Sequence, residues 1–345
     1  MKKNIPIGII GAGRIGKLHI SNILQNIPDF SIEIVADIAI DSLKKWAELH
    51  RIKKITDNPQ DVFDNPDVKA VLICSSTDTH AEFIEKAANA GKDIFCEKPI
   101  DPDVKVIKNV LDTVEENKVK LQIGFNRRFD HNFKRVRNLV ASGEIGDPHI
   151  VKITSRDPAP PPIDYIKVSG GLFNDMTIHD WDMARYLGGS QTGEVTEVYA
   201  MGGVLVDEKI GSEGNDIDTC AVVLRYENGG MAMIDNSRQA VYGYDQRVEV
   251  FGSKGVAIAE NDRPNNVKFY NEKDISMDKI PYFFLERYMQ SYTDEIVSFY
   301  ECLREDKQPV VDGKDGLMAV VVAKAAMKSL CENRPVKITE IQFGF

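Results

Sequence analysis

The strongest constraint on the fold of this chain is a glycine-rich turn close to its start. Gly11, Gly13 and Gly16 form a G-x-G-x-x-G motif, which follows the apolar run Ile5–Ile10 and precedes a helical stretch at 17–26. Between a strand and a helix, the first glycine permits a tight turn, the second lets the backbone approach a pyrophosphate, and the third allows close helix packing. The turn therefore predicts a dinucleotide-binding Rossmann domain, with the phosphates at the start of the helix. The expected cofactor contacts here are Gly11, Ala12, Gly13, Arg14 and Ile15.

An acidic residue downstream of this turn indicates which dinucleotide is bound. A second apolar stretch at 31–36 ends at Asp37, 21 positions after Gly16. A carboxylate at about this spacing binds the hydroxyl groups of the adenosine ribose. It would repel a 2′-phosphate, and the next residue, Ile38, offers no cation. The site should therefore prefer NAD over NADP, although Asp37 could also cap the helix that follows it, a role compatible with binding.

Apolar segments alternate with helical ones throughout the first third of the chain, as in a parallel sheet. The segment 70–74 is apolar throughout, which is typical of a strand buried on both faces, and another strand at 93–96 runs into Glu97, Lys98 and Pro99. Ligands of open parallel sheets bind at the carboxyl ends of the strands. Lys98 is therefore expected where a nicotinamide and a substrate would meet, the alternative being an ordinary surface lysine.

A different pattern begins after this alternation stops. Strands separated by glycine-rich turns predict a largely antiparallel sheet, and two long helices follow at 286–304 and 316–333. The predicted architecture is an α/β Rossmann domain followed by an α+β domain with a mixed sheet. The predicted boundaries are 1–124 for the first domain and 125–345 for the second, whose last helix could pack back on the first.

A stretch in the middle of the chain carries residues suited to proton transfer. Gly170 and Gly171 precede Asp175 and His179, which are four positions apart and would share one face of a continuous helix. A carboxylate beside an imidazole, which titrates near neutral pH, can transfer a proton. The alternative is a solvated pair on a surface helix. A metal site that includes Asp182 is disfavoured, because zinc usually recruits more His or Cys ligands.

The composition argues against several classes of partner. The chain has 43 basic and 53 acidic side chains and a net charge of −10, which argues against binding to nucleic acid or to an anionic membrane. No apolar run is long enough to span a bilayer. The five cysteines have no C-x-x-C pair, which favours reduced, buried thiols in a cytoplasmic protein. They are Cys74, Cys96, Cys220, Cys302 and Cys331.

Motifs in a fixed order resemble those of the Gfo/Idh/MocA oxidoreductase family over essentially the whole chain. They are the glycine turn with Asp37, residues 75–77 with His80, 97–99, 124–129, and Gly170-Gly171 with Asp175 and His179. Within the family, the chain is most similar to bacterial inositol dehydrogenases. The stretches that carry this finer similarity are 127–130, 155–158 and 236–245.

The resemblance implies NAD as cofactor, a cyclitol substrate bound by the second domain, and a homotetramer in which the open face of the second sheet meets another subunit. Further cofactor contacts are implied at Ser75, Ser76, Thr77, His80, Glu97 and Lys98. The residues expected at the substrate are Lys98, Arg127, Asp157, Asp175, His179, Tyr242, Tyr244 and Tyr292.

Together these residues predict hydride transfer from a secondary alcohol to NAD. His179 is assigned as the general base, since an imidazole can take the hydroxyl proton as the hydride leaves. Asp175 would bind a substrate hydroxyl and favour the protonated imidazole. Lys98 would hold the reacting oxygen and stabilise its negative charge.

Five alternatives stay open on the sequence alone. Arg127 could form a surface ion pair with Asp130, and Tyr292 could serve only in helix packing. Either Tyr242 or Tyr244 could face the substrate. The substrate could be myo-inositol, scyllo-inositol or another polyol or sugar. The same fold could also serve as a non-catalytic NAD-binding sensor.

Overall fold

The computed structural model describes residues 4–341, which separate into two compact units. The first unit contains residues 4–126 and 292–318, and the second contains residues 127–291 and 319–341. The chain therefore leaves the first unit and later returns to it, through the second half of helix α11 (Phe284–Glu305). Among the described residues, no helix is both long and apolar enough to cross a membrane.

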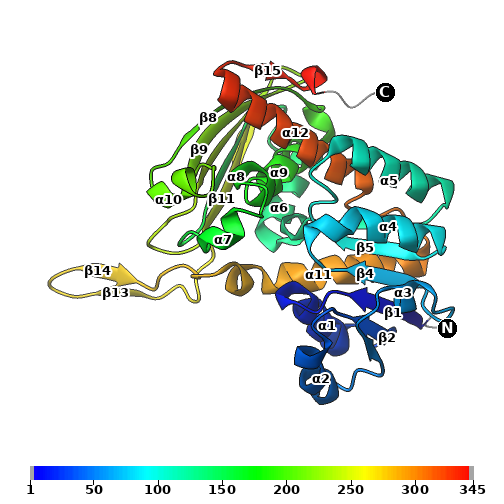
Figure 1. Ribbon diagram of the computed structural model, residues 1–345. Helices are drawn as coiled ribbons and strands as arrows, with labels where there is room; N and C mark the ends of the chain where they lie inside the picture. The colour runs from blue at the N-terminus through cyan, green and yellow to red at the C-terminus, as the bar shows by residue number, and fades with distance from the viewer. Residues whose placement is uncertain (1–3, 342–345) are drawn as a thin grey trace. The chain divides into compact units, whose positions relative to one another are not determined.

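A six-stranded parallel sheet forms the centre of the first unit (Figure 1). In spatial order its strands are β3 (Ile55–Thr56), β2 (Phe30–Ala36), β1 (Ile5–Ile10), β4 (Ala70–Ile73), β5 (Asp93–Glu97) and β6 (Leu121–Gly124). The apolar runs account for this arrangement, because parallel strands covered on both faces need no polar alternation. All four residues of β4 are buried, for example. The structure confirms the predicted Rossmann fold.

Helices of the first unit pack against this sheet. They are α1 (Arg14–Asn26), α2 (Ile40–Leu49), α3 (Gln60–Phe63), α4 (His80–Asn89), α5 (Val104–Glu116) and the part of α11 from residue 292. Helix α1 begins at Arg14 rather than at residue 17, because Gly13 serves as its N-cap. In α11, the ring of Phe299 lies 6.2 Å from that of Phe30 and 6.0 Å from that of Phe95. Burying each such ring stabilises the unit by roughly 1.5–3 kcal/mol.

A seven-stranded mixed sheet forms the centre of the second unit. In spatial order its strands are β12 (Gly255–Ala259), β11 (Asp245–Gly252), β7 (Pro148–Arg156), β10 (Met231–Ser237), β9 (Thr219–Tyr226), β8 (Val195–Gly203) and β15 (Val336–Lys337). The β7–β10 pair is parallel, and the other neighbouring pairs are antiparallel. This topology confirms the predicted α+β architecture.

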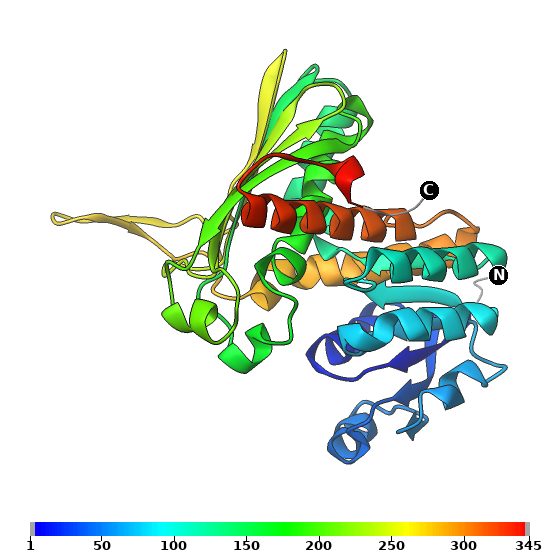
Figure 2. The ribbon, with the colours of Figure 1, turned by 45° about the horizontal axis from the view of Figure 1, so that its top comes forward.

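One face of this sheet is covered by helices (Figure 2). Helices α6 (His131–Ala141) and α9 (Ile178–Gly188) pack on it. The other helices of the unit are α7 (Ile163–Ile166), α8 (Leu172–Asp175), α10 (Glu208–Ser212) and the part of α12 (Gly313–Glu332) from residue 319. Buried and exposed residues alternate along β9, as expected when only one face is covered. Exposed apolar side chains of the opposite face are Met201, Val223, Met231, Met233, Phe251, Val256 and Ile258.

A two-stranded hairpin extends away from the rest of the second unit in both Figure 1 and Figure 2. It pairs β13 (Lys268–Tyr270) with β14 (Ile275–Met277), and every residue of both strands is exposed. Phe269 and Ile275 are 58 % and 66 % exposed. An isolated hairpin is marginally stable in water, so its apolar side chains favour contact with another surface.

The helix predicted to carry both Asp175 and His179 is interrupted. Helix α8 ends at Asp175, and α9 begins at Ile178. At the break, the N–H and the hydroxyl of Thr177 both donate to the carbonyl oxygen of Leu172, at 2.9 and 3.1 Å, which widens the turn. The prediction of one continuous helix is wrong, because a threonine hydroxyl competes with the regular backbone bonds.

Candidate active site

The glycine turn of the first unit has the geometry of a phosphate-binding loop. Gly11 has a φ of +91°, and a Cβ there would lie 2.5 Å from the backbone nitrogen of Ser75. A Cβ on Gly16 would lie 2.0 Å from the carbonyl oxygen of Gly11, so that only glycine fits either position. Beside Gly13, in contrast, no described atom lies within 4 Å of such a Cβ, and α1 starts there without a side-chain cap. Its N–H groups and positive dipole end can therefore receive a pyrophosphate.

The carboxylate of Asp37 is held beside this turn. Its Oδ2 accepts the N–H of Ala12 at 2.6 Å, and its Oδ1 accepts the N–H of Ala39 at 2.7 Å. The side chain thereby joins the carboxyl end of β2 to the glycine turn, where a dinucleotide places its adenosine ribose. A negative charge in this position would repel the 2′-phosphate of NADP.

Glu97, Lys98 and Pro99 lie at the carboxyl end of β5. His80, expected at the cofactor, is 1 % exposed, and its ring nitrogens lie 2.7 Å from the carbonyl oxygen of Pro99 and 3.1 Å from that of Ser75. The imidazole therefore holds the turn between β4 and α4 against the segment that carries Lys98. Its contacts within the first unit are to protein backbone.

In the second unit, a double-glycine turn sets the position of Asp175. Gly170 and Gly171 have φ values of +84° and +82°, a conformation that favours glycine. A Cβ on Gly171 would lie 2.9 Å from a carboxylate oxygen of Asp216. Both oxygens of that carboxylate accept the N–H of Leu172, at 3.0 and 2.9 Å, and so cap α8. The glycines therefore make room for the cap of the helix that ends at Asp175.

Two polar side chains hold the Asp175 carboxylate. Tyr165 donates its hydroxyl to Oδ1 at 2.8 Å, and Arg238 donates to Oδ2 at 3.3 Å. Arg238 is 1 % exposed and also reaches Asp216 at 3.5 Å. Burial, together with the charge of Asp175, raises the pKa of Tyr165, so the phenol remains a donor. His179 follows in the first turn of α9 and is half-buried.

Arg127 is buried and paired within the second unit. Its Nη1 lies 2.7 Å from Oδ1 of Asp180, and both terminal nitrogens lie 3.3 Å from the hydroxyl of Ser155. Burial opposes the charge, but the Asp180 carboxylate more than offsets this and raises the pKa of Arg127, which stays a cation. The alternative of a surface ion pair with Asp130 is wrong, because the Asp130 carboxylate pairs with Arg287.

Asp157 supplies another carboxyl group close to Arg127 and Arg238. Burial raises the pKa of Asp157 to about 6, and the two guanidinium groups oppose this rise. At neutral pH the group is therefore mostly ionised and accepts hydrogen bonds. The charges of Asp175 and Asp180 also act on Asp157, so the second unit gathers two buried cations and several carboxylates in one place.

The structure separates the three candidate tyrosines. Tyr244 is 7 % exposed, and its hydroxyl lies 3.5 Å from Nη2 of Arg127. Tyr242 is 45 % exposed and donates to Asp245 at 2.6 Å. Tyr292 belongs to the first unit, where its ring packs edge-on against a buried imidazole at 5.9 Å. Of these three tyrosines, Tyr244 is the one whose hydroxyl reaches Arg127.

Asp182, considered as a metal ligand with Asp175 and His179, is directed elsewhere. Its carboxylate accepts hydrogen bonds from Nε of Arg128 at 2.9 Å and from Nη2 at 2.5 Å. The two side chains form a bidentate pair, and both are buried. Such a pair is stable because the planar guanidinium matches the carboxylate. The contact with Arg128 therefore accounts for Asp182 without a metal.

Sequence reasoning missed three members of this group: Tyr165, Asp216 and Arg238. They come from α7, the segment before β9 and the residue after β10, so no spacing motif relates them. Arg238 does fall in the 236–245 stretch that carries the finer family resemblance, and that was the available signal. For Tyr165 and Asp216 there was none, because only folding brings them to Asp175.

Two family models match the chain. Residues 5–125 match an oxidoreductase family with an NAD-binding Rossmann fold. Residues 133–258 match the GFO/IDH/MocA C-terminal domain. The first match confirms the predicted NAD cofactor and the predicted class of enzyme, an oxidoreductase.

Similarity to known proteins extends over almost the full length. The chain is 52 % identical to the uncharacterized oxidoreductase YrbE of Bacillus subtilis, covering 98 % of each. It is 48 % identical to the myo-inositol 2-dehydrogenase of Thermotoga maritima, covering 97 % of this chain and 99 % of that one. The structure of the scyllo-inositol dehydrogenase of Lactobacillus casei was solved with bound NAD(H) and scyllo-inositol. That chain is 30 % identical to this one with a TM-score of 0.89, and the match covers 98 % of this chain and 100 % of that one. The chain therefore belongs to the Gfo/Idh/MocA family of NAD-binding oxidoreductases.

Proposed function

We propose that this protein is an NAD-dependent inositol 2-dehydrogenase, which oxidises one ring hydroxyl of a cyclitol to the ketone. The observation that carries the proposal is the charged group around Asp175 and Arg127 in the second unit. Guanidinium groups supply donors and carboxylates supply acceptors, as a ring with a hydroxyl on every carbon requires. Each polar group left unpaired in a closed site would cost about 1–3 kcal/mol. The 48 % identical relative from Thermotoga maritima bears this activity in its name.

The cofactor belongs to the first unit. The N–H groups near Gly13 receive the pyrophosphate, and Asp37 receives the ribose hydroxyls. Bound there, NAD supplies the nicotinamide that accepts the hydride. The charge of Asp37 makes NAD rather than NADP the preferred dinucleotide.

Three residues manage the hydroxyl group that reacts. His179 takes the hydroxyl proton as a general base, a role typically worth about 10²–10⁴-fold in rate. The negative charge of Asp175, held by Tyr165 and Arg238, stabilises the imidazolium that forms. Lys98 donates a hydrogen bond to the reacting oxygen and stabilises its developing charge. One hydride and one proton leave the alcohol, which balances the oxidation to a ketone.

Other residues of the second unit recognise the remaining hydroxyl groups. Arg127 and Tyr244 act as donors, and Asp157 acts as an acceptor because it is mostly ionised above about pH 6. Tyr242 is not assigned to the substrate, since its hydroxyl is used by Asp245. Tyr292 is assigned to packing in the first unit.

A panel of alcohols with NAD tests this proposal by NADH absorbance. myo-Inositol is expected to give the highest kcat/KM, because the 48 % identical relative is named for that substrate and the scyllo-inositol enzyme is 30 % identical. scyllo-Inositol, which differs in the orientation of one hydroxyl, is the matched comparison. Turnover confined to an aldose or an acyclic polyol would assign another family activity. NAD binding without turnover of any alcohol would indicate a sensor.

The open sheet face and the exposed hairpin support a homotetramer. Apolar side chains such as Phe251, Ile258 and Phe269 lie exposed there, and contiguous apolar patches mark interaction sites. Light scattering of the purified chain should therefore give about four times the 38.6 kDa chain mass. The five cysteines form no disulfide, which fits a cytoplasmic location. The expectation that all five are buried is wrong for Cys331, which is exposed, and for Cys74, which is only partly buried.

A further inference from the structure

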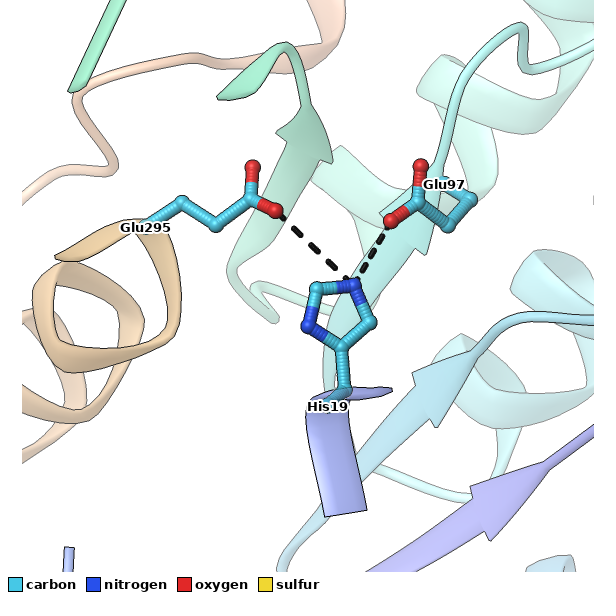
Figure 3. A group of neighbouring side chains, drawn as sticks. All are labelled: His19, Glu97 and Glu295. Carbon is cyan, nitrogen blue, oxygen red and sulfur yellow. Dashed lines mark hydrogen bonds and ion pairs between the residues drawn. The ribbon is translucent and has the colours of Figure 1, made fainter. Parts of the chain in front are cut away.

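His19, Glu97 and Glu295 converge inside the first unit (Figure 3). They come from α1, the end of β5 and α11. Nε2 of His19 lies 2.7 Å from Oε1 of Glu97 and 3.8 Å from Oε1 of Glu295. The side chains of His19 and Glu295 are fully buried, and that of Glu97 is 14 % exposed. Acidic side chains are almost never fully buried unless they are paired, so this group requires an explanation.

Aromatic rings border the group, and Glu295 makes no hydrogen bond within it. The rings of Phe95 and Tyr292 lie edge-on to His19, at 5.3 and 5.9 Å. Neither carboxyl oxygen of Glu295 accepts a hydrogen bond from any described residue. Burial, and then the charge of Glu97, raise the pKa of Glu295 well above its ordinary value. Glu295 therefore holds its proton more tightly than an exposed glutamate does, and among the described residues His19 forms its hydrogen bond with Glu97.

Glu97 is confined from two sides. His19 bonds its Oε1, and a Cβ on Gly124 of β6 would lie 2.9 Å from its Oε2, so the carboxylate packs directly against the glycine. The side chain is thereby fixed at the last residue of β5. The next residue along the backbone is Lys98, so the same contacts restrain the peptide from which the lysine projects.

A bound metal ion is a poorer explanation of the group. Zinc binds nitrogen and oxygen at about 2.0–2.2 Å, which sets two tetrahedral ligands about 3.4 Å apart. The 2.7 Å between His19 and Glu97 is the length of a direct hydrogen bond. A direct hydrogen bond therefore explains the distance between His19 and Glu97 better than a shared metal ion does.

We propose that His19 is a positioning residue, which acts on Lys98 through Glu97. His19 holds the Glu97 carboxylate by one hydrogen bond, and Glu295 lies beside the pair without a hydrogen bond to either of them. The inference rests on the proposed function, because it takes Lys98 as the residue that touches the reacting oxygen. Neither His19 nor Glu295 itself contacts substrate.

A matched pair of variants tests the hydrogen bond. His19→Leu keeps the bulk of the side chain and removes the donor, whereas His19→Gln keeps an N–H close to the place of Nε2. In His19→Leu, kcat should fall about 10- to 100-fold, the usual effect of a small misplacement, while the Kd for NAD changes less than about twofold. His19→Gln should recover most of kcat. Thermal melting of both variants shows whether each is folded.

Labelling of Lys98 gives a readout that needs no turnover. Reaction of the cofactor-free chain with acetic anhydride, followed by mass spectrometry, reports the reactivity of each lysine. The rate at Lys98 should change about threefold or more in His19→Leu and return toward the wild-type rate in His19→Gln, because reactivity follows the local charge and position. The rate at the exposed Lys44 should not change.

The possible outcomes distinguish failure of the positioning role from failure of the proposed function. Equal loss in both variants, an NAD affinity that falls in step with kcat, or unchanged Lys98 labelling overturns the positioning role. So does a stoichiometric metal that is found in the purified wild type and lost in His19→Leu. If the wild type oxidises no cyclitol while the labelling follows the expected pattern, the proposed function fails and the positioning of Lys98 stands.

Discussion

Replacing Glu295 by Gln should stabilise the protein, and the gain should grow with pH. Glutamine has nearly the same shape as the neutral acid but cannot ionise. Burial and the charge of Glu97 raise the pKa of Glu295 above its ordinary value of 4.5. His19 and Cys74 also lie beside this carboxyl group. The wild type must therefore keep a proton that its unfolded chain would release.

The direction of the stability difference between Glu295→Gln and the wild type follows from this difference in proton binding. Below about pH 4.5 the carboxyl group is protonated in both states, so wild type and Glu295→Gln should be equally stable. As pH rises, the unfolded wild type gains by ionising and the folded state does not, until the folded pKa is reached. Each pKa unit of separation is worth about 1.4 kcal/mol, which raises the Tm of a domain of this size by about 3–6 °C.

Urea unfolding at about pH 5 and about pH 8 measures this effect directly. The free energy of unfolding of Glu295→Gln should exceed that of the wild type at the higher pH, with a much smaller difference at the lower pH. Glu301→Gln is the matched control, because Glu301 lies exposed on the same helix and should change stability by less than about 0.5 kcal/mol. The reasoning would be refuted if the wild type were more stable than Glu295→Gln at about pH 8. It would mean that Glu295 is ionised and paired in the folded state.

Two further predictions concern the reaction. Lys98→Ala or His179→Ala should lower kcat by about 10²–10⁴-fold while NAD affinity changes less than about twofold, as titration of NAD into each variant can show. Normal turnover with lost NAD affinity would contradict the roles assigned. Asp37→Ser should lower the ratio of kcat/KM for NAD over NADP by about tenfold or more, since about 1.4 kcal/mol of repulsion is removed. An unchanged ratio would mean that another residue reads the ribose.

Local sequence patterns determined the cofactor-binding features of the first unit. The glycines of the turn are required by contacts within a few residues or with the next strand, such as the 2.0 Å between a Cβ on Gly16 and the carbonyl oxygen of Gly11. Asp37 follows at a distance set by one helix and one strand, and the apolar runs specify buried parallel strands. Such short-range constraints leave a signal in a single sequence.

The tertiary structure alone decided which charges meet. It paired Arg127 with Asp180 and placed Tyr165, Asp216 and Arg238 around the Asp175 carboxylate. The break in the helix between α8 and α9 likewise depends on the bonds of one threonine. Such contacts join segments far apart in the chain, and their strength depends on burial, which periodicity does not report. The motifs therefore predict the kind of chemistry, whereas the protonation and pairing of its carboxylates arise only from the packed structure.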